Sequence, residues 1–234
     1  LPDRENLKQY FEDYFILLRP RDIVSGDFYW FTEIHGRILV AAADCTGHGV
    51  AGGLMSMLGI SYLNEIVNMQ HVISPEQVLT KLREMIVNSL KQKSHNNNSL
   101  LSGIDISIIS LNSDKTEMEF AGANNPIYIV RNNELKEYAP NKMPVALYDN
   151  MRPFTKQTVK LKKGDQVYMF TDGFTDQFGG DYQKKFKFKP FRKLIVETNN
   201  LGMEEQKNKL NHTYEMWKGD LDQVDDVLVL GVKI

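Results

Sequence analysis

The sequence has only one cysteine, Cys45, among its 234 residues. A single cysteine excludes an internal disulfide framework and a cysteine-based zinc cluster, and it fits a reducing compartment, so we expect a cytoplasmic protein. The sequence also lacks any run of roughly 18 consecutive apolar residues, the length of a membrane span, and it opens without a signal-peptide pattern. We therefore expect no direct insertion into a membrane.

An excess of charge of one sign is missing as well. The chain has 28 Lys and Arg residues against 30 Asp and Glu residues, a net charge of -2, and no pattern predicts a basic groove lined with base-stacking aromatics. Both features weigh against nucleic acid as a partner. The 42% of hydrophobic residues is ordinary for a globular protein. Without repeats or linkers, the pattern predicts one domain over residues 1–234.

Apolar periodicity predicts a mixture of helices and strands. Leu7, Tyr10, Phe11, Tyr14 and Phe15 have helical spacing and predict a short amphipathic helix that leads into the domain over residues 1–13. A hairpin is expected over residues 27–44, and four helices over 50–69, 75–93, 189–198 and 203–217. Further strand-like runs cover residues 104–111, 117–121, 127–131, 134–138, 157–161, 166–171 and 225–234. Because most of these strands follow one another without helices between them, we expect antiparallel sheets.

Local signals mark several boundaries. The segment "SPEQ" opens the second long helix, with Ser74 as the expected N-cap and Gln77 at the capping-box position. The segments "HG", "RNNE" and "KKGD" predict turns, and "SHNNNS" (residues 94–99) predicts a loop.

Aspartates recur where apolar extended runs begin or end. They are Asp27, Asp44, Asp172 and the pair Asp225–Asp226, and a glycine lies close to each of the first three. Asp is disfavoured inside strands, and glycine allows the backbone to approach a ligand closely. If the strand ends converge, the clustered carboxylates need cations to remain ionised, and their oxygen donors select Mg²⁺ or Mn²⁺. The alternative is that each aspartate only caps a turn.

Five segments together carry a family resemblance. "VSGDFYWF", "AAADCTGHGVAGG", "AGANNPIYIV", "VYMFTDGFTDQFGG" and "DDVLVLGV" resemble, in this order and spacing, the PP2C-type protein phosphatases of the bacterial SpoIIE/RsbU branch. The resemblance covers residues 14–234. It implies an α+β fold, a β-sandwich of two antiparallel sheets flanked by helices, and removal of phosphate from phosphoserine or phosphothreonine in proteins.

The resemblance also implies a centre of two Mn²⁺ or Mg²⁺ ions. In this reading Asp44 bridges both ions, the backbone carbonyl of Cys45 joins one of them, and Asp172 and Asp225 ligate the same ion. Asp27 acts through a coordinated water or directly. A water between two such cations becomes the nucleophile, so the thiol of Cys45 is not needed as one.

Other motif residues leave alternatives open. His48 is expected either to protonate the leaving oxygen, since histidine titrates near neutral pH, or to hold the glycine turn by packing. Asp105, in "SGID", is expected to face solvent from a strand, and its alternative is a weak third metal site. Arg21 is the nearest match to the phosphate-holding arginine of related eukaryotic enzymes. Ser25 and Ala51 replace residues common in the family without removing a ligand.

Two further segments have a structural and a functional interpretation. "KKFKFKPFRK" (residues 184–193) is either a solvated segment with its phenylalanines in the core or a basic lip that steers an acidic phosphoprotein. "AGANNP" predicts a tight turn between strands that approaches the substrate.

Alternatives to the phosphatase are a catalytically silent signalling scaffold with the same fold and a metal nuclease or other two-metal phosphohydrolase. The complete aspartate set argues against the scaffold, and the charge balance against the nuclease. The resemblance points to a phosphorylated anti-sigma-factor antagonist as substrate, to a missing N-terminal sensor or regulatory region, and to a homodimer formed through regulatory helices. No residue identifies the part of the chain that binds substrate.

Overall fold

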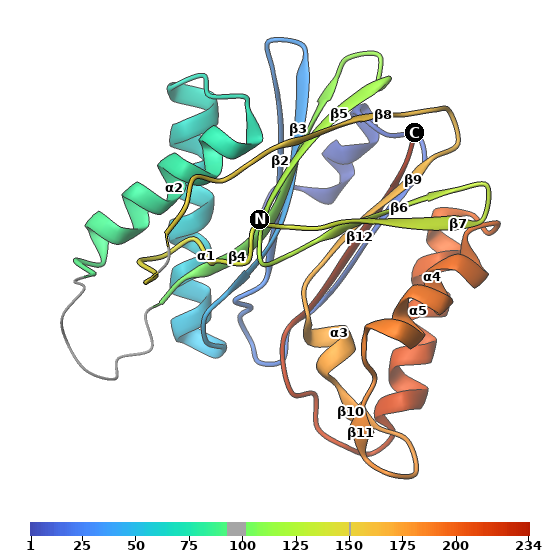
Figure 1. Ribbon diagram of the computed structural model, residues 1–234. Helices are drawn as coiled ribbons and strands as arrows, with labels where there is room; N and C mark the ends of the chain where they lie inside the picture. The colour runs from blue at the N-terminus through green and yellow to red at the C-terminus, as the bar shows by residue number, and fades with distance from the viewer. Residues whose placement is uncertain (93–101, 150) are drawn as a thin grey trace.

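Two five-stranded antiparallel sheets stack face to face at the centre of the computed structural model, which describes residues 1–92, 102–149 and 151–234 (Figure 1). The first sheet has the order β1 (Tyr14–Arg19), β12 (Val227–Lys233), β9 (Gln166–Phe170), β6 (Ile127–Arg131) and β7 (Glu134–Tyr138). The second has the order β2 (Phe28–Ile34), β3 (Arg37–Cys45), β4 (Ile104–Asn112), β5 (Glu117–Ala123) and β8 (Gln157–Lys160). A small ribbon pairs β10 (Phe178–Gly179) with β11 (Lys184–Lys185).

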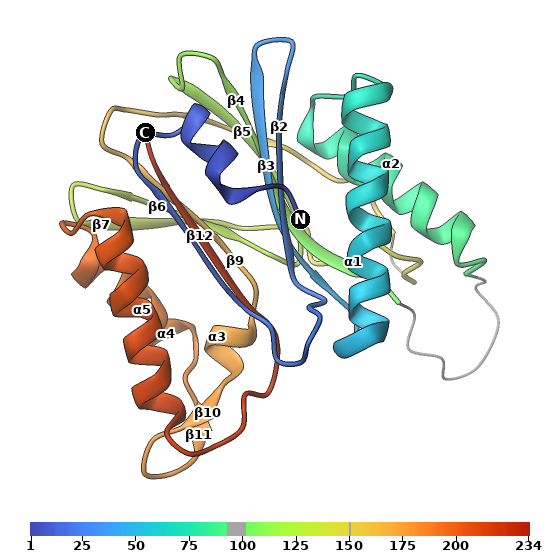
Figure 2. The same cartoon turned by 180° about the vertical axis from the view of Figure 1, so that it is seen from behind.

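Helices cover the outer face of each sheet (Figures 1 and 2). The second sheet carries α1 (Gly49–Leu63), the π-helical segment η2 (Asn64–Met69) and α2 (Pro75–Ser89). The first sheet carries α4 (Phe188–Thr198) and α5 (Met203–Lys218). Two short elements remain, the 3₁₀ helix η1 (Arg4–Gln9) and α3 (Gly173–Asp176). The predicted α+β sandwich of two antiparallel sheets flanked by helices is therefore confirmed.

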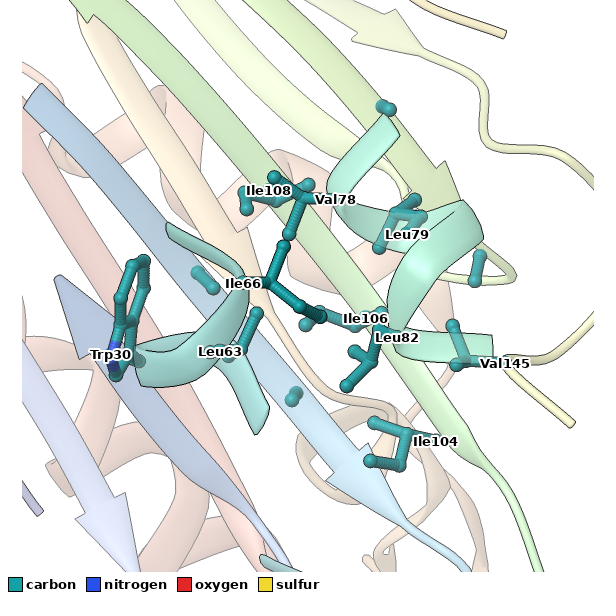
Figure 3. Close-up of a cluster of buried hydrophobic side chains, with 14 of the residues drawn as sticks. Trp30, Leu63, Ile66, Val78, Leu79, Leu82, Ile104, Ile106, Ile108 and Val145 are labelled. Carbon is teal, nitrogen blue, oxygen red and sulfur yellow. The ribbon is translucent and has the colours of Figure 1, made fainter. Parts of the chain in front are cut away.

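Side-chain alternation divides the apolar residues among three cores. In β12, Val227 and Val229 pack toward α4 and α5, whereas Leu228 and Leu230 enter the core between the sheets. A strand that is buried on both faces is apolar at every position, because successive side chains point to opposite faces. The third core joins α1, η2 and α2 to the second sheet; Figure 3 shows Trp30, Leu63, Ile66, Val78, Leu79, Leu82, Ile104, Ile106, Ile108 and Val145 in it.

The predicted lead-in helix is shorter than its apolar spacing indicated. The helical segment is the 3₁₀ helix η1, which ends at Gln9, and Tyr14 and Phe15 begin β1, a strand that the sequence reading missed. β1 pairs with β12 along its whole length. Phe15 contacts the core under α4 and α5 while Ile16 contacts the core between the sheets. Residues spaced for one helical face thus also satisfied the two-residue period of a strand.

The turns predicted at "HG", "RNNE" and "KKGD" form, and each contains residues with positive backbone φ. His35–Gly36 (φ 50° and 69°) and Asn132–Asn133 (φ 51° and 64°) close two-residue hairpins, the conformation that favours Asn and Gly. Ser74 is the N-cap of α2, but its hydroxyl donates to the Glu76 carboxylate, so the predicted capping box with Gln77 is wrong. α2 ends at Ser89, and the predicted loop at residues 94–99 lies outside the described residues.

One helical run in the described part of the chain, Gly49–Met69, has the length and mean hydropathy (1.3 over its best window) of a membrane span. Length and composition alone are weak evidence, because helices packed in the core of soluble proteins pass the same test. One face of the run packs on the second sheet through Met55, Leu63 and Ile66. The opposite face exposes Val50 and Leu54.

Candidate metal centre

The four predicted aspartates come from the ends of four strands. Asp27 immediately precedes β2 and Asp44 is the second-last residue of β3, while Asp172 follows β9 and Asp225 precedes β12. Burial raises the pKa of the Asp44 carboxyl well above its usual range, and the charges of Asp27, Asp172 and Asp225 raise it further. Carboxylates influence one another in this way only when they are neighbours. The structure therefore brings the predicted set together at one end of the sandwich.

Asp27 is the most deeply buried carboxyl of the set. Its side chain accepts a hydrogen bond from the hydroxyl of Thr171 at 2.6 Å, and that hydroxyl oxygen accepts the backbone N–H of Leu228 at 3.0 Å. Burial raises the pKa of Asp27 well above its usual range, and nearby acids add to the rise while the Thr171 bond opposes it. Thr171, one residue before Asp172, thus fixes the orientation of Asp27.

Asp172 and Asp225 are more accessible. Burial raises the pKa of Asp172 to about 6, with further contributions from Asp176 and Asp225. Asp225 is half-buried, and one of its carboxylate oxygens accepts the N–H of Asp226 at 2.8 Å. Burial is also the largest cause of the raised pKa of Asp225, whereas Arg21 lowers it.

A cavity of about 360 Å³ opens at this end of the sandwich. It is lined by Asp44, Cys45, Thr46, Gly47, His48, Asp105 and Asp225. Asp105 lies opposite Asp44 in the β3–β4 ladder and accepts a hydrogen bond from Asn124 at 2.9 Å. The expectation that Asp105 only faces solvent was therefore wrong, because the end of β4 is part of the cavity wall. Asp27 faces a neighbouring groove between α1 and the loop before β2 instead.

The turn that follows Asp44 owes its shape to glycine. Gly47 has φ +91° and Gly49 has φ +61°, values that side chains with a Cβ rarely adopt. The N–H of Thr46 donates to the Gly103 carbonyl at 3.0 Å, which holds the turn against the start of β4. Cys45 is buried and unpaired by disulfide, and burial raises the pKa of its thiol well above the usual range. That direction disfavours the thiolate and thus a nucleophilic role.

Asp226 has a structural role in the fold. The sequence analysis did not distinguish this role from that of Asp225. It is 2% exposed, and its two carboxylate oxygens accept the backbone N–H groups of Arg21 and Gly26, each at 2.7 Å. The loop before β2 is fastened in this way to the start of β12. Gly173 packs directly against the backbone of Asp226. A Cβ added to Gly173 would be 1.9 Å from the Asp226 carbonyl oxygen.

Two cationic residues lie beside the cluster. Arg21 is exposed and donates to the Val224 carbonyl at 3.0 Å. Lys185 pairs with Asp176 at 2.7 Å and lowers the pKa of Asp172. Lys185 is thus the member of the 184–193 run that lies near the carboxylates.

Some of the phenylalanines in residues 184–193 lie in the core, as the structural interpretation of this segment predicted. Phe186 and Phe191 are buried in the core under α4 and α5, while Phe188 is 39% exposed. The predicted "AGANNP" turn places Asn124, with φ 57°, against Asp105. The predicted turn between β5 and β6 therefore forms, and it contacts one residue of the cavity wall.

The donors present match hard divalent cations in their chemistry. Carboxylate oxygens of Asp44, Asp172 and Asp225 and the carbonyl of Cys45 form an all-oxygen set, which favours Mg²⁺ or Mn²⁺ over zinc or copper. In residues 1–92, 102–149 and 151–234, no three His, Cys, Asp or Glu side chains form a group that could hold a metal ion. The fit thus rests on donor type and on the mutual electrostatic influence of these carboxyls.

Solved structures with the same architecture define the class. The SiaA PP2C domain of Pseudomonas aeruginosa has a TM-score of 0.89 at 27% identity, over 100% of this chain and 91% of that chain. The PP2C domain of SpoIIE from Bacillus subtilis, solved with a fragment of its regulatory domain, has a TM-score of 0.74 at 19% identity, over 95% and 63%. The RsbU and RsbW domains of a Mycobacterium tuberculosis protein give 0.70 at 18%, over 94% and 60%. The fold is that of a PP2C-type serine/threonine protein phosphatase.

The sequence comparison identifies the family within this class of phosphatases. The SpoIIE family, described as stage II sporulation protein E, matches residues 34–234. The chain therefore belongs to the SpoIIE family. A search of curated proteins gave no match.

Proposed function

We propose that this domain hydrolyses phosphoserine or phosphothreonine in a protein substrate with the help of two Mn²⁺ or Mg²⁺ ions. The observation that carries the proposal is the cluster of Asp27, Asp44, Asp172 and Asp225, whose carboxyls raise one another's pKa at one end of the sandwich. RsbX, a structural neighbour with a TM-score of 0.62 at 13% identity over 94% of both chains, was solved in complex with magnesium. That neighbour supports the choice of cation.

The predicted ligands would hold the two cations. Asp44, the backbone carbonyl of Cys45, Asp172 and Asp225 would hold the ions, with Asp27 acting through water or directly. When bound, such a pair lowers the pKa of a shared water and offsets charge on the phosphoryl oxygens. The cavity lined by Asp44 and Asp225 is the space for the phosphoryl group.

The remaining residues bind and orient. Thr171 holds Asp27 in one orientation. Arg21, whose side chain lies beside Asp225, is placed to attract the dianionic phosphate. His48, on the cavity wall, is the side chain that delivers a proton to the departing serine oxygen.

The proposed partner is a phosphorylated protein in bacterial signalling, of the anti-sigma-factor antagonist class that the family resemblance indicates. We place the reaction in the cytoplasm, in keeping with the single buried cysteine. Phosphoproteome comparison between wild-type and deletion strains, followed by dephosphorylation of the purified candidate, tests the partner.

Turnover of p-nitrophenyl phosphate and of a phosphoserine protein with Mn²⁺ or Mg²⁺ tests the activity. We expect both reactions to stop in EDTA, and Asp44→Asn and Asp172→Asn each to lower the rate by several orders of magnitude, because a carboxamide neither neutralises nor bridges two cations. Titration should show weaker Mn²⁺ binding by both variants. Asp114→Asn, in an exposed turn at the far end of β4, is the control.

The result also separates the alternatives. A wild-type domain without metal-dependent turnover would be a signalling scaffold. Cleavage of an oligonucleotide in preference to the phosphoprotein would make it another two-metal phosphohydrolase. An Asp44→Asn or Asp172→Asn variant that keeps more than about a tenth of the wild-type rate would overturn the ligand assignment.

A further inference from the structure

His48 and Asp22 form a hydrogen-bonded pair at the edge of the cavity. The Nδ1 atom of His48 is 2.9 Å from a carboxylate oxygen of Asp22, and the two side chains are 50% and 46% exposed. A carboxylate can only accept, so Nδ1 carries the proton in this contact. His48 lines the cavity and Asp22 does not. The ring of His48 therefore meets the Asp22 carboxylate through Nδ1 and also borders the cavity.

The carboxylate of Asp22 is itself held in place. Its loop is fastened on both sides by Asp226, which accepts the N–H groups of Arg21 and Gly26. On the other side, the carboxylate lies over Gly49, since a Cβ added to Gly49 would be 3.2 Å from the same oxygen that meets His48. The start of α1 and the start of β12 thus fix the position of Asp22 together.

We propose that Asp22 is a positioning residue that keeps the ring of His48, which in its doubly protonated imidazolium form carries a proton on each nitrogen, turned so that its Nε2–H faces the leaving oxygen in the cavity. This inference rests on the proposed phosphatase function. As the water oxygen bonds to phosphorus, the bond between phosphorus and the serine oxygen breaks and its electron pair stays on that oxygen. The serine oxygen takes the proton from Nε2, which leaves the neutral ring with its remaining proton on Nδ1, facing Asp22. The proton lost by the attacking water returns to the imidazole through solvent, so the charges and atoms balance.

The alternative is that the pair only stabilises the glycine turn. An exposed pair of this kind adds little to stability, and the helix α1 receives no hydrogen bond from the His48 side chain at its N-cap. The contact of the pair is specific to one ring nitrogen: Nδ1 meets the Asp22 carboxylate, which leaves Nε2 as the nitrogen that can act in the cavity that His48 lines. A carboxylate that orients an imidazole is the arrangement by which enzymes select one tautomer of a proton-transferring histidine.

The test compares two small esters that differ in their leaving groups. Phenyl phosphate needs a proton on its leaving oxygen, whereas p-nitrophenolate departs without one. We expect Asp22→Asn and His48→Gln to lower kcat for phenyl phosphate by at least about tenfold with KM unchanged, and to change p-nitrophenyl phosphate turnover by less than about twofold. In the double variant, the effect of Asp22→Asn should vanish. Asp114→Asn is the matched surface control.

Several kinetic results would overturn the proposal. An equal loss on both esters would point to damaged metal binding, and a full additional loss in the double variant would show that Asp22 acts independently of His48. If Asp22→Asn leaves the kinetics of an active enzyme unchanged, Asp22 is not a positioning residue. That result would not contradict the proposed phosphatase function.

A second readout does not depend on activity. Long-range ¹H–¹⁵N NMR of the metal-free protein should show the neutral His48 ring protonated at Nδ1 in the wild type. In Asp22→Ala the proton should move to Nε2, because the carboxylate that holds it at Nδ1 is gone. A wild-type ring protonated at Nε2, or the same tautomer in both proteins, would overturn the proposal even if neither ester is hydrolysed. Inactivity of the wild type alone would overturn the proposed function.

Discussion

The carboxylate of Asp226 accepts the backbone N–H of Gly26 at 2.7 Å, across 200 residues of sequence. Its second oxygen accepts the N–H of Arg21, so one buried side chain fastens the loop that carries Asp22 and leads into Asp27. Asp225, the preceding residue, lines the cavity instead. Two adjacent aspartates thus have different tasks: Asp226 fastens the loop before β2, and Asp225 belongs to the proposed ligand set.

This division predicts opposite outcomes for the two residues. Asp226→Ala should lower the free energy of unfolding by about 2–5 kcal/mol, because two buried N–H groups lose their acceptor. Asp225→Asn should abolish most of the activity while the melting temperature of the metal-free protein changes little. Urea denaturation and Mn²⁺-dependent turnover of both variants check this, with Asp222→Asn on the neighbouring surface as control. An unfolded Asp225→Asn, or a stable Asp226→Ala, would contradict the division.

Cys45 is expected to tolerate loss of its sulfur. Cys45→Ala should keep at least about half of the wild-type rate, because only the backbone carbonyl is asked of this position, and it should cost about 1 kcal/mol of stability for the small cavity left in the core. Steady-state kinetics with Mn²⁺ and thermal denaturation are the measurements. Complete inactivation with normal fold and metal content would favour thiol chemistry.

Asp172 should make the stability of the metal-free protein depend on pH. Its pKa is about 6 in the folded chain, against 3.8 for the free group. The folded state therefore favours the protonated form, and the stability that this provides is present below about pH 4 and is lost as the pH rises through about 6. Relative to Asp172→Asn, which does not titrate, the wild type should lose stability between pH 4.5 and pH 7.5 in EDTA.

Urea denaturation of both proteins at the two pH values measures that difference. Saturating Mn²⁺ at pH 7.5 should make the wild type more stable than Asp172→Asn, because the ionised carboxylate then gains a cation that the amide cannot hold. Asp114→Asn, in an exposed turn, should show no such pH-dependent difference. A gap between wild type and Asp172→Asn that stays constant with pH would show that the Asp172 carboxyl is not perturbed.

Much of the fold could be predicted because its signals are local. The short apolar runs of β3 and β4 and the turn residues His35–Gly36 and Asn132–Asn133 indicate strand and turn within a few residues. β1 could not be predicted in this way, since apolar residues on both faces of a strand also satisfy a helical spacing. Its identity depends on pairing with β12, more than 200 residues away in the chain.

The same difference between local signals and long-range contacts decides which parts of the site could be predicted. Asp27, Asp44, Asp172 and Asp225 could be singled out because each stands where an apolar strand-like run begins or ends and within a segment that resembles a family motif. The tasks of the remaining residues depend on contacts between distant segments, such as Asp22 with His48 across 26 residues. Asp105 was placed in solvent because nothing in "SGID" indicates that its strand end forms a wall of the cavity. Only the register of β3 with β4 shows that.

Gly47 provides the last prediction, because its φ of +91° shapes the turn between Asp44 and α1. Saturating Mn²⁺ should raise the melting temperature of the wild type by on the order of 5–10 °C, with a gain that grows with metal concentration. Gly47→Val should fold but lose both this gain and the catalysis, since a β-branched residue cannot adopt the turn that directs the Asp44 carboxylate and the Cys45 carbonyl. Gly164→Val is a matched control: its φ is +92°, and like Gly47 it has no neighbouring atom within 4 Å of an added Cβ. Both variants should lose about 1–3 kcal/mol to backbone strain, but only Gly164→Val should keep the response to Mn²⁺. Equal responses of the two variants, or a melting temperature indifferent to Mn²⁺, Mg²⁺ and EDTA in the wild type, would separate this turn from any metal centre.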